Sequence, residues 1–174
     1  ENLSGRVELG INESTVTSRL IFGVWKFGAG SFKVGKDYTP VSQFVSGQVF
    51  SADLGMLGTG TVYGGRHGQL ALTFGNFTIA AIAPDTSGVL QNAETGAITT
   101  GDEDEWYPKL EASWGMAFDT WNFGLQAGFQ GYQVEDAAVP TAADPNNTED
   151  IDVYSWLLGA TSSVNLGPIT LNGT

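Results

Sequence analysis

The sequence contains no cysteine and a single histidine, His67. Without cysteine there is no disulfide and no thiolate ligand for a metal ion. One histidine cannot build a multi-histidine metal site, and no cysteine–histidine pair is available for nucleophilic catalysis. We therefore expect no metal centre, no organic cofactor and no catalytic residue, and we predict that the protein is not an enzyme.

Positive charge is also scarce, with 7 Lys and Arg residues against 19 Asp and Glu, which gives a net charge of -12. This balance argues against a nucleic-acid partner, because phosphate binding needs a basic surface. The acids are concentrated in two blocks, residues 102–105 and 135–152. We interpret both blocks as solvated loops. Loop-bound Ca²⁺, held by carboxylate and carbonyl oxygens, is the alternative, although the spacing matches no calcium loop.

No uninterrupted apolar run approaches the ~18 residues that a membrane-spanning helix needs. This excludes a helical membrane protein. It does not exclude a membrane barrel, in which lipid-facing residues alternate with lumen-facing ones. The chain has no secretory signal and begins inside a strand pattern, which we interpret as a mature or internal fragment of an exported protein.

Apolar and polar residues alternate along much of the sequence. From Trp106 to Val134 apolar and polar side chains alternate, interrupted only at Asp119 and Thr120, and so predict two antiparallel strands. Each arm is longer than the usual strand of about five or six residues. Aromatic residues gather at both ends of the apolar face, as in strands that cross a membrane in about ten residues between two aromatic girdles.

The same period of two recurs along the whole chain and predicts a single all-β domain over residues 1–174. The expected strands are 3–12, 15–27, 31–38, 66–74, 77–83, 106–118, 121–134, 152–164 and 169–172. Beyond residue 28 short turns alternate with long loops. Successive connections of an antiparallel sheet lie at opposite ends, so the short turns share one rim and the long loops the other. This arrangement predicts a transmembrane antiparallel β-barrel.

Two stretches, Gly30–Pro40 and Gly64–Ala83, flank the long apolar segment Val41–Gly65. The first stretch is a strand that follows a glycine turn and carries a basic residue near its end. A long loop comes next, and then a strand that begins with Arg. This order resembles the bacterial general porins. The resemblance implies a 16-stranded homotrimeric barrel in the outer membrane of a diderm (Gram-negative) bacterium, with about nine strands in this chain. It implies passive diffusion of ions and small hydrophilic solutes, with membrane lipids as further partners.

The resemblance also assigns parts of the pore. Residues 41–65 would form a constriction loop that narrows the channel. Lys36 and Arg66 would match the basic residues on the wall that faces this loop, with Lys33 as a further candidate. Strict alternation puts Lys33 and Lys36 on opposite faces, so both reach the lumen only if Gly35 lies at a bulge.

The carboxylates that usually face this basic cluster are few here. The loop offers only Asp53, with Asp37 at its base. The sequence therefore departs from the family pattern, and we expect a weaker field across the pore than the resemblance alone implies.

Five further charged residues share the polar parity of their strands: Arg6, Glu8, Arg19, Lys109 and Glu111. A charge on the lipid face of a barrel costs about 2–4 kcal/mol at midplane, so we expect these residues in the lumen. There they would tune which solutes pass, or simply form ion pairs on a wet wall. Trp25 has the opposite parity from the other tryptophans and would line the pore or plug the wall. A further hypothesis is that three tyrosines form a track on which sugars stack: Tyr107, Tyr132 and Tyr154.

Two alternatives remain open. One is a soluble β-sandwich or jelly roll that binds or cleaves carbohydrate with its aromatic face and its loop acids. The other is a structural envelope barrel whose lumen is closed by residues 41–65. A sandwich would bury the tryptophans and phenylalanines against an opposing sheet, whereas a membrane barrel would leave them exposed.

Overall fold

The computed structural model describes residues 2–11, 14–43, 62–91, 97–140, 144 and 146–173. These residues form antiparallel strands and connections, and none of them lies in a helix that could cross a membrane. The strands are β1 (Leu3–Ile11), β2 (Val16–Phe27), β3 (Gly30–Tyr38), β4 (Arg66–Phe74), β5 (Phe77–Ile82), β6 (Val89–Gln91), β7 (Ile98–Thr100), β8 (Asp102–Asp104), β9 (Lys109–Ala117), β10 (Trp121–Ala138), β11 (Thr148–Asn165) and β12 (Thr170–Gly173).

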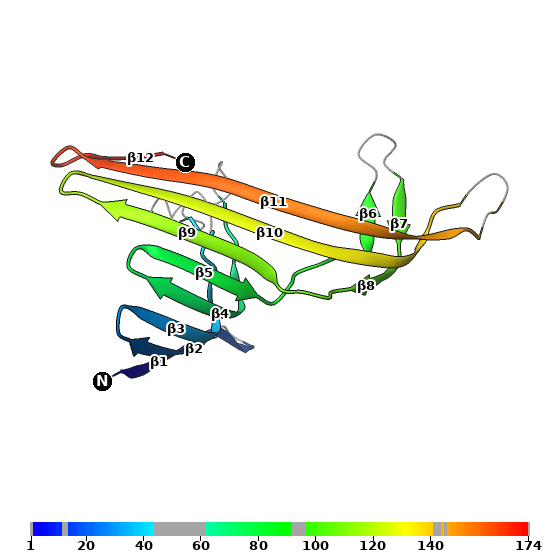
Figure 1. Ribbon diagram of the computed structural model, residues 1–174, viewed down its shortest axis with the longest axis horizontal. Helices are drawn as coiled ribbons and strands as arrows, with labels where there is room; N and C mark the ends of the chain where they lie inside the picture. Colours follow the sequence, from blue (N-terminus) through cyan, green and yellow to red (C-terminus); the bar gives the residue numbers. More distant parts are fainter. Residues whose placement is uncertain are drawn as a thin grey trace. The chain divides into compact units, whose positions relative to one another are not determined.

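Nine strands form one path in the order β1-β2-β3-β4-β5-β9-β10-β11-β12, with β8 paired to β10, while β6 and β7 make a separate two-stranded sheet (Figure 1). The nine-strand path matches the nine predicted strands, so the all-β antiparallel prediction is confirmed. In the described residues β1 and β12 end the path, and the sheet does not close into a barrel.

Three strands were not predicted. β6, β7 and β8 lie within residues 85–105, between the expected strands 77–83 and 106–118. Each has three residues, too few for a period of two to stand out. β10 and β11 also extend further than expected, with 18 residues each.

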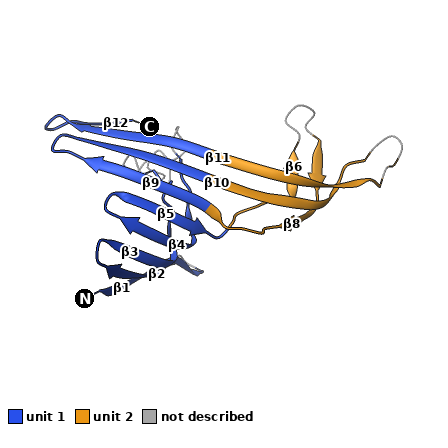
Figure 2. Ribbon diagram, viewed as in Figure 1, with its two compact units in different colours: residues 1–83, 110–128, 157–174 blue, residues 84–109, 129–156 orange. Residues whose placement is uncertain are grey.

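Contacts divide the chain into two units (Figure 2). Unit 1 comprises residues 1–83, 110–128 and 157–174, and unit 2 comprises residues 84–109 and 129–156. In unit 1 the short connections β2–β3, β4–β5, β9–β10 and β11–β12 lie at one end of the sheet (Figure 1). Gly28 and Gly75 take positive φ angles of 40° and 55° in the two tightest of these turns, as two-residue hairpins require.

The register gives unit 1 one strongly apolar face, which we call the apolar face. Directly opposed residues share a face, and the pairs Val34–Leu70 and Leu72–Ile79 put large apolar side chains together. Fifteen of these side chains are 37% to 74% exposed: Leu3, Val7, Ile21, Trp25, Val34, Leu70, Leu72, Phe74, Phe77, Ile79, Leu110, Met116, Trp121, Leu125 and Leu158. The described residues therefore place no second layer over this face.

A shallow apolar hollow shows that the face continues across several strands. It is lined by Phe77 of β5, Trp114 of β9, Leu125 of β10 and Leu158 of β11. The opposite side, which we call the polar face, carries pairs such as Thr73–Thr78 and a small buried cluster that includes Ala71 and Ile82.

A bulge in the β1–β2 hairpin explains the parity of Trp25. The register shifts between Glu8 and Leu9 and leaves Arg19 as an extra residue on β2. Arg19 was expected to mark the polar face of this strand. Because it is the extra residue of the bulge, counting every second residue from Arg19 assigns residues 20–27 to the wrong faces. Trp25 pairs with Phe32 and is 53% exposed on the apolar face, so it lies on the side of the sheet opposite to the one that its parity in the sequence predicted.

Candidate functional site

Residues 39–43 and 62–65, which we call the inward segment, pack on the polar face of unit 1. The backbone N–H of Val41 donates to Oε2 of Glu111 at 3.1 Å, and Val41 is only 4% exposed. Nε2 of Gln43 donates to Oε1 of Gln126 at 3.0 Å. The described ends of the predicted constriction loop therefore contact the wall of the sheet, while Asp53 lies outside the described residues.

Glycines make room for this segment. A Cβ atom on Gly159 of β11 would lie 2.9 Å from Nε2 of Gln43, and one on Gly64 would lie 2.8 Å from Cγ2 of Val41. Real Cβ atoms are not found at such distances, so a side chain at Gly159 would displace the amide of Gln43, and one at Gly64 would displace Val41 within the segment. The sequence thus permits a close approach that its periodicity does not reveal.

Glu111 was predicted to face an open lumen, but it is 2% exposed and accepts the hydrogen bond from Val41. It lies on the polar face as expected and anchors the inward segment there instead of contacting free solvent. Lys109, at the start of β9, is half-buried in unit 2.

Lys33 lies on the polar face. Its Nζ donates to the carboxylate of Asp37 and stands 5.1 Å from the ring centroid of Phe22. The positive charge is thus already paired within its own strand.

Lys36 lies on the other face. The pairing of β3 with both neighbours runs through Gly35 without a shift, so the bulge that would bring both lysines to one side is absent there. Lys36 pairs with Ile21 and Gly68, and its Nζ donates to the backbone carbonyl of Ser18 at 3.1 Å.

Arg66 opens β4 opposite Tyr38, and its guanidinium carbon is 5.5 Å from the centroid of that ring. Its Nη1 atom is buried and has no hydrogen-bond partner among the described residues. Alternation from Gly68 puts Arg66 on the side of Lys36, away from Lys33. The structure does not gather the three predicted basic residues on one face.

Arg6, Glu8 and Arg19 meet in one ion-pair group. The Glu8 carboxylate accepts from Nη2 of Arg6 and from Nε of Arg19, the latter at 2.8 Å. The side chains of Arg6, Arg19 and Glu8 are 59%, 43% and 30% exposed. Solvent screens exposed pairs of this kind, so they contribute little to stability, which fits the interpretation of ion pairs on a water-exposed surface.

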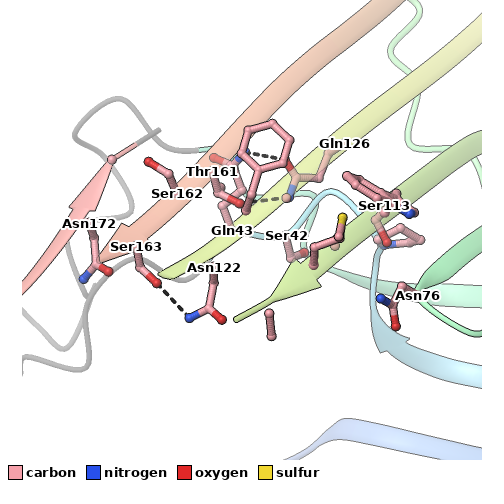
Figure 3. A pocket seen from close by; sticks show the side chains of 18 residues that line it. Ser42, Gln43, Asn76, Ser113, Asn122, Gln126, Thr161, Ser162, Ser163 and Asn172 are labelled. Carbon is pink, nitrogen blue, oxygen red and sulfur yellow. Dashed lines mark hydrogen bonds between the residues drawn. The ribbon is translucent and has the colours of Figure 1, made fainter. Parts of the chain in front are cut away.

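An open cavity of about 660 Å³ lies on the polar face of unit 1, between Ser42 and Gln43 of the inward segment and strands β9 to β12 (Figure 3). None of its lining residues is charged. This site was not predicted, because the predicted pore residues were charged or aromatic. The signal that could have found it is the run of hydroxyl and amide side chains at polar parity: Ser113, Asn122, Gln126, Thr161 and Ser163.

In unit 2 three aromatic rings stack, one from the segment before β9, one from β10 and one from β11. The rings of Tyr107 and Phe129 are 6.4 Å apart and 2° from parallel, and those of Phe129 and Tyr154 are 6.3 Å apart and 17° from parallel. Tyr132 lies outside this stack, and its hydroxyl donates to the carbonyl of Ser87. Only two of the three tyrosines of the expected track therefore share one stack.

The described residues bring no three His, Asp or Glu side chains close enough to hold a metal ion. Comparison with protein-family models, with curated proteins and with solved structures finds no match for this chain.

Proposed function

We propose that the chain is part of the wall of an outer-membrane channel for passive diffusion of ions and small hydrophilic solutes, and that it has no enzymatic role. The observation that carries the proposal is the two-sided sheet of unit 1. Large apolar side chains are exposed on one face, and the inward segment packs on the polar face.

The exposed apolar face favours lipid as its neighbour. Soluble monomers rarely expose contiguous apolar patches larger than a few hundred Å². Here the exposed side chains extend from β1 to β11. Lys36 lies near the end of β3 and reaches a backbone carbonyl, as a lysine at a membrane boundary can do by snorkelling. The soluble sandwich would need a covering sheet that the described residues do not provide.

The strand lengths of unit 1 fit the dimensions of a bilayer. Strands β3 and β4 have 9 residues each, and membrane barrels cross with ~9–11 residues. Trp121 stacks on Phe118 at 4.2 Å beside the β9–β10 turn. We assign this stack to one aromatic girdle of the barrel.

The sheet has two edge strands, β1 and β12, and we propose that both pair with further strands of the barrel. In lipid each unpaired backbone group costs several kcal/mol, so β1 and β12 need further strands to close the barrel. Assembly as a homotrimer and location in a diderm outer membrane complete the proposal and rest on the resemblance to porins.

The test is reconstitution of the protein in planar lipid bilayers. We expect stepwise conductance openings. A protein that stays monodisperse without detergent would contradict the lipid-facing assignment of the apolar face.

The burial of Val41 also fits a barrel closed by the inward segment, which conducts nothing. The same recordings separate the two functions, since a folded and inserted protein without openings would favour the closed barrel.

A further inference from the structure

We propose that the cavity on the polar face of unit 1 is a subsite for an uncharged, polyhydroxylated solute such as a sugar. This inference rests on the proposed channel and names the class of solute that the channel favours. The cavity's volume of about 660 Å³ lies within the ~300–1,000 Å³ that is typical of sites for small molecules.

The lining of the cavity carries no charge. The 18 lining side chains drawn in Figure 3 include no Asp, Glu, Lys, Arg or His. Charged groups do occur elsewhere on the polar face, for example in the ion pairs Glu8–Arg19 and Lys33–Asp37. An ion that leaves water for this cavity gains no counter-charge, whereas a neutral solute needs only replacement hydrogen bonds.

The hydrogen bonds beside the cavity run in one direction, toward Thr161. The N–H of Val62 donates to Oε1 of Gln43 at 3.1 Å, and Nε2 of Gln43 donates to Oε1 of Gln126 at 3.0 Å. Nε2 of Gln126 then donates to Oγ1 of Thr161 at 3.5 Å. Each group donates to the next, so the Thr161 hydroxyl accepts from the wall. Its own hydrogen has no recorded protein acceptor among the described residues.

A second hydroxyl lies two residues along the same strand. Nδ2 of Asn122 donates to Oγ of Ser163 at 3.0 Å, which leaves the Ser163 hydrogen as a donor and Oδ1 of Asn122 as an acceptor (Figure 3). Thr161 and Ser163 are about 7 Å apart along an extended strand. Adjacent donors and acceptors match the hydroxyl groups of a sugar, each of which both donates and accepts.

The glycines of the two strands keep this arrangement open. A Cβ atom on Gly124 would lie 2.6 Å from Oγ1 of Thr161, and one on Gly159 would lie 2.9 Å from Nε2 of Gln43. A side chain at either position would push aside one of the groups that make the hydrogen-bond chain.

The test uses maltotriose, a neutral sugar, with two readouts. Current through single channels in planar bilayers reports block by the sugar, and calorimetry on the detergent-solubilised protein reports binding directly. Ser163→Ala and Thr161→Val remove one donor each at nearly constant shape. We expect each to weaken block and binding by about fivefold, the typical net worth of one hydrogen bond.

The matched control is Thr73→Val, which removes a hydroxyl from the same face outside the cavity, where it pairs with Thr78. We expect maltotriose to act on Thr73→Val as on the unmodified protein. Circular dichroism of each variant checks that the sheet has formed.

The outcomes separate this inference from the proposed channel. Openings that maltotriose does not block, or blocks equally in Ser163→Ala, overturn the subsite and leave the channel standing. If no openings occur, the proposed channel is contradicted and calorimetry alone tests the subsite. Maltotriose binding that Ser163→Ala weakens supports the subsite, and absence of binding overturns it.

Discussion

The polar face of unit 1 has two regions of different chemistry. Over β1 to β3 it carries charge, in the groups Arg6–Glu8–Arg19 and Lys33–Asp37. Over β9 to β11 it carries amides and hydroxyls around an uncharged cavity. In the first region one carboxylate is shared by two arginines and Lys33 pairs with Asp37, so the ion pairs leave a positive excess. In the second region the polar groups that line the cavity form a directed chain of hydrogen bonds. The two regions therefore present different charge to whatever contacts the polar face.

The largest effect is expected at Glu111, the anchor of the inward segment. Glu111→Ala leaves the buried N–H of Val41 without its acceptor, which costs about 1–3 kcal/mol of folding free energy. The inward segment is then held less tightly, and single-channel conductance should rise. Urea unfolding in detergent and conductance recordings measure the two effects. Glu111→Gln keeps an acceptor oxygen and should stay close to the unmodified protein; equal loss in both variants would contradict the anchoring role.

A charge placed at the uncharged cavity should give the second region an ion preference of its own. Gln126→Glu keeps the shape of the side chain and adds a carboxylate at the cavity. We expect the preference for cations over anions to rise by about fivefold, because one charge about 4 Å away is worth about that factor even in water. Reversal potentials in a salt gradient measure the change. Gln91→Glu, on β6 outside the cavity, is the control, and an equal shift there would refute the assignment.

A smaller change in the opposite direction is expected in the charged region. Glu8→Gln removes the carboxylate that pairs with both Arg6 and Arg19 and leaves their charges uncompensated. The preference for anions should rise, and the shift should shrink at high salt because the group is exposed. Reversal potentials at two ionic strengths test this, and a shift independent of salt would contradict it.

The smallest effect is expected at Lys36. Because the register puts it on the apolar face, Lys36→Gln should leave ion preference unchanged. Lys33→Gln on the polar face is its matched partner and should shift ion preference by freeing Asp37. Equal shifts in the two variants would show that both lysines face the lumen.

The strands of the main sheet were predictable because alternation is a local signal. Stretches such as Arg66–Phe74 and Trp121–Val134 carry it over enough residues to be read without tertiary information. The side chains of β2 were harder to place, since one extra residue at Arg19 reverses the apparent parity and nothing in the local sequence marks the bulge.

The candidate site was predictable only in part. The apolar character of residues 41–65 indicated that this segment packs against something, and its described ends do so. The burial of Glu111 and the hydrogen bond from Gln43 to Gln126 join residues far apart in the sequence. No periodicity encodes such contacts, because they depend on how the segment crosses the folded sheet.

The central claim, that the apolar face contacts lipid, has a direct test because the chain has no cysteine. Leu72→Cys and Thr73→Cys place single spin labels on opposite faces of β4, and the reconstituted protein is exposed to oxygen and to a water-soluble nickel chelate. The account predicts that the label at position 72 collides with oxygen and is shielded from nickel, and that the label at position 73 is less shielded from nickel. Two results would contradict the account: a label at position 72 that is as accessible to the nickel chelate as a label in bulk water, or one that is shielded from both reagents.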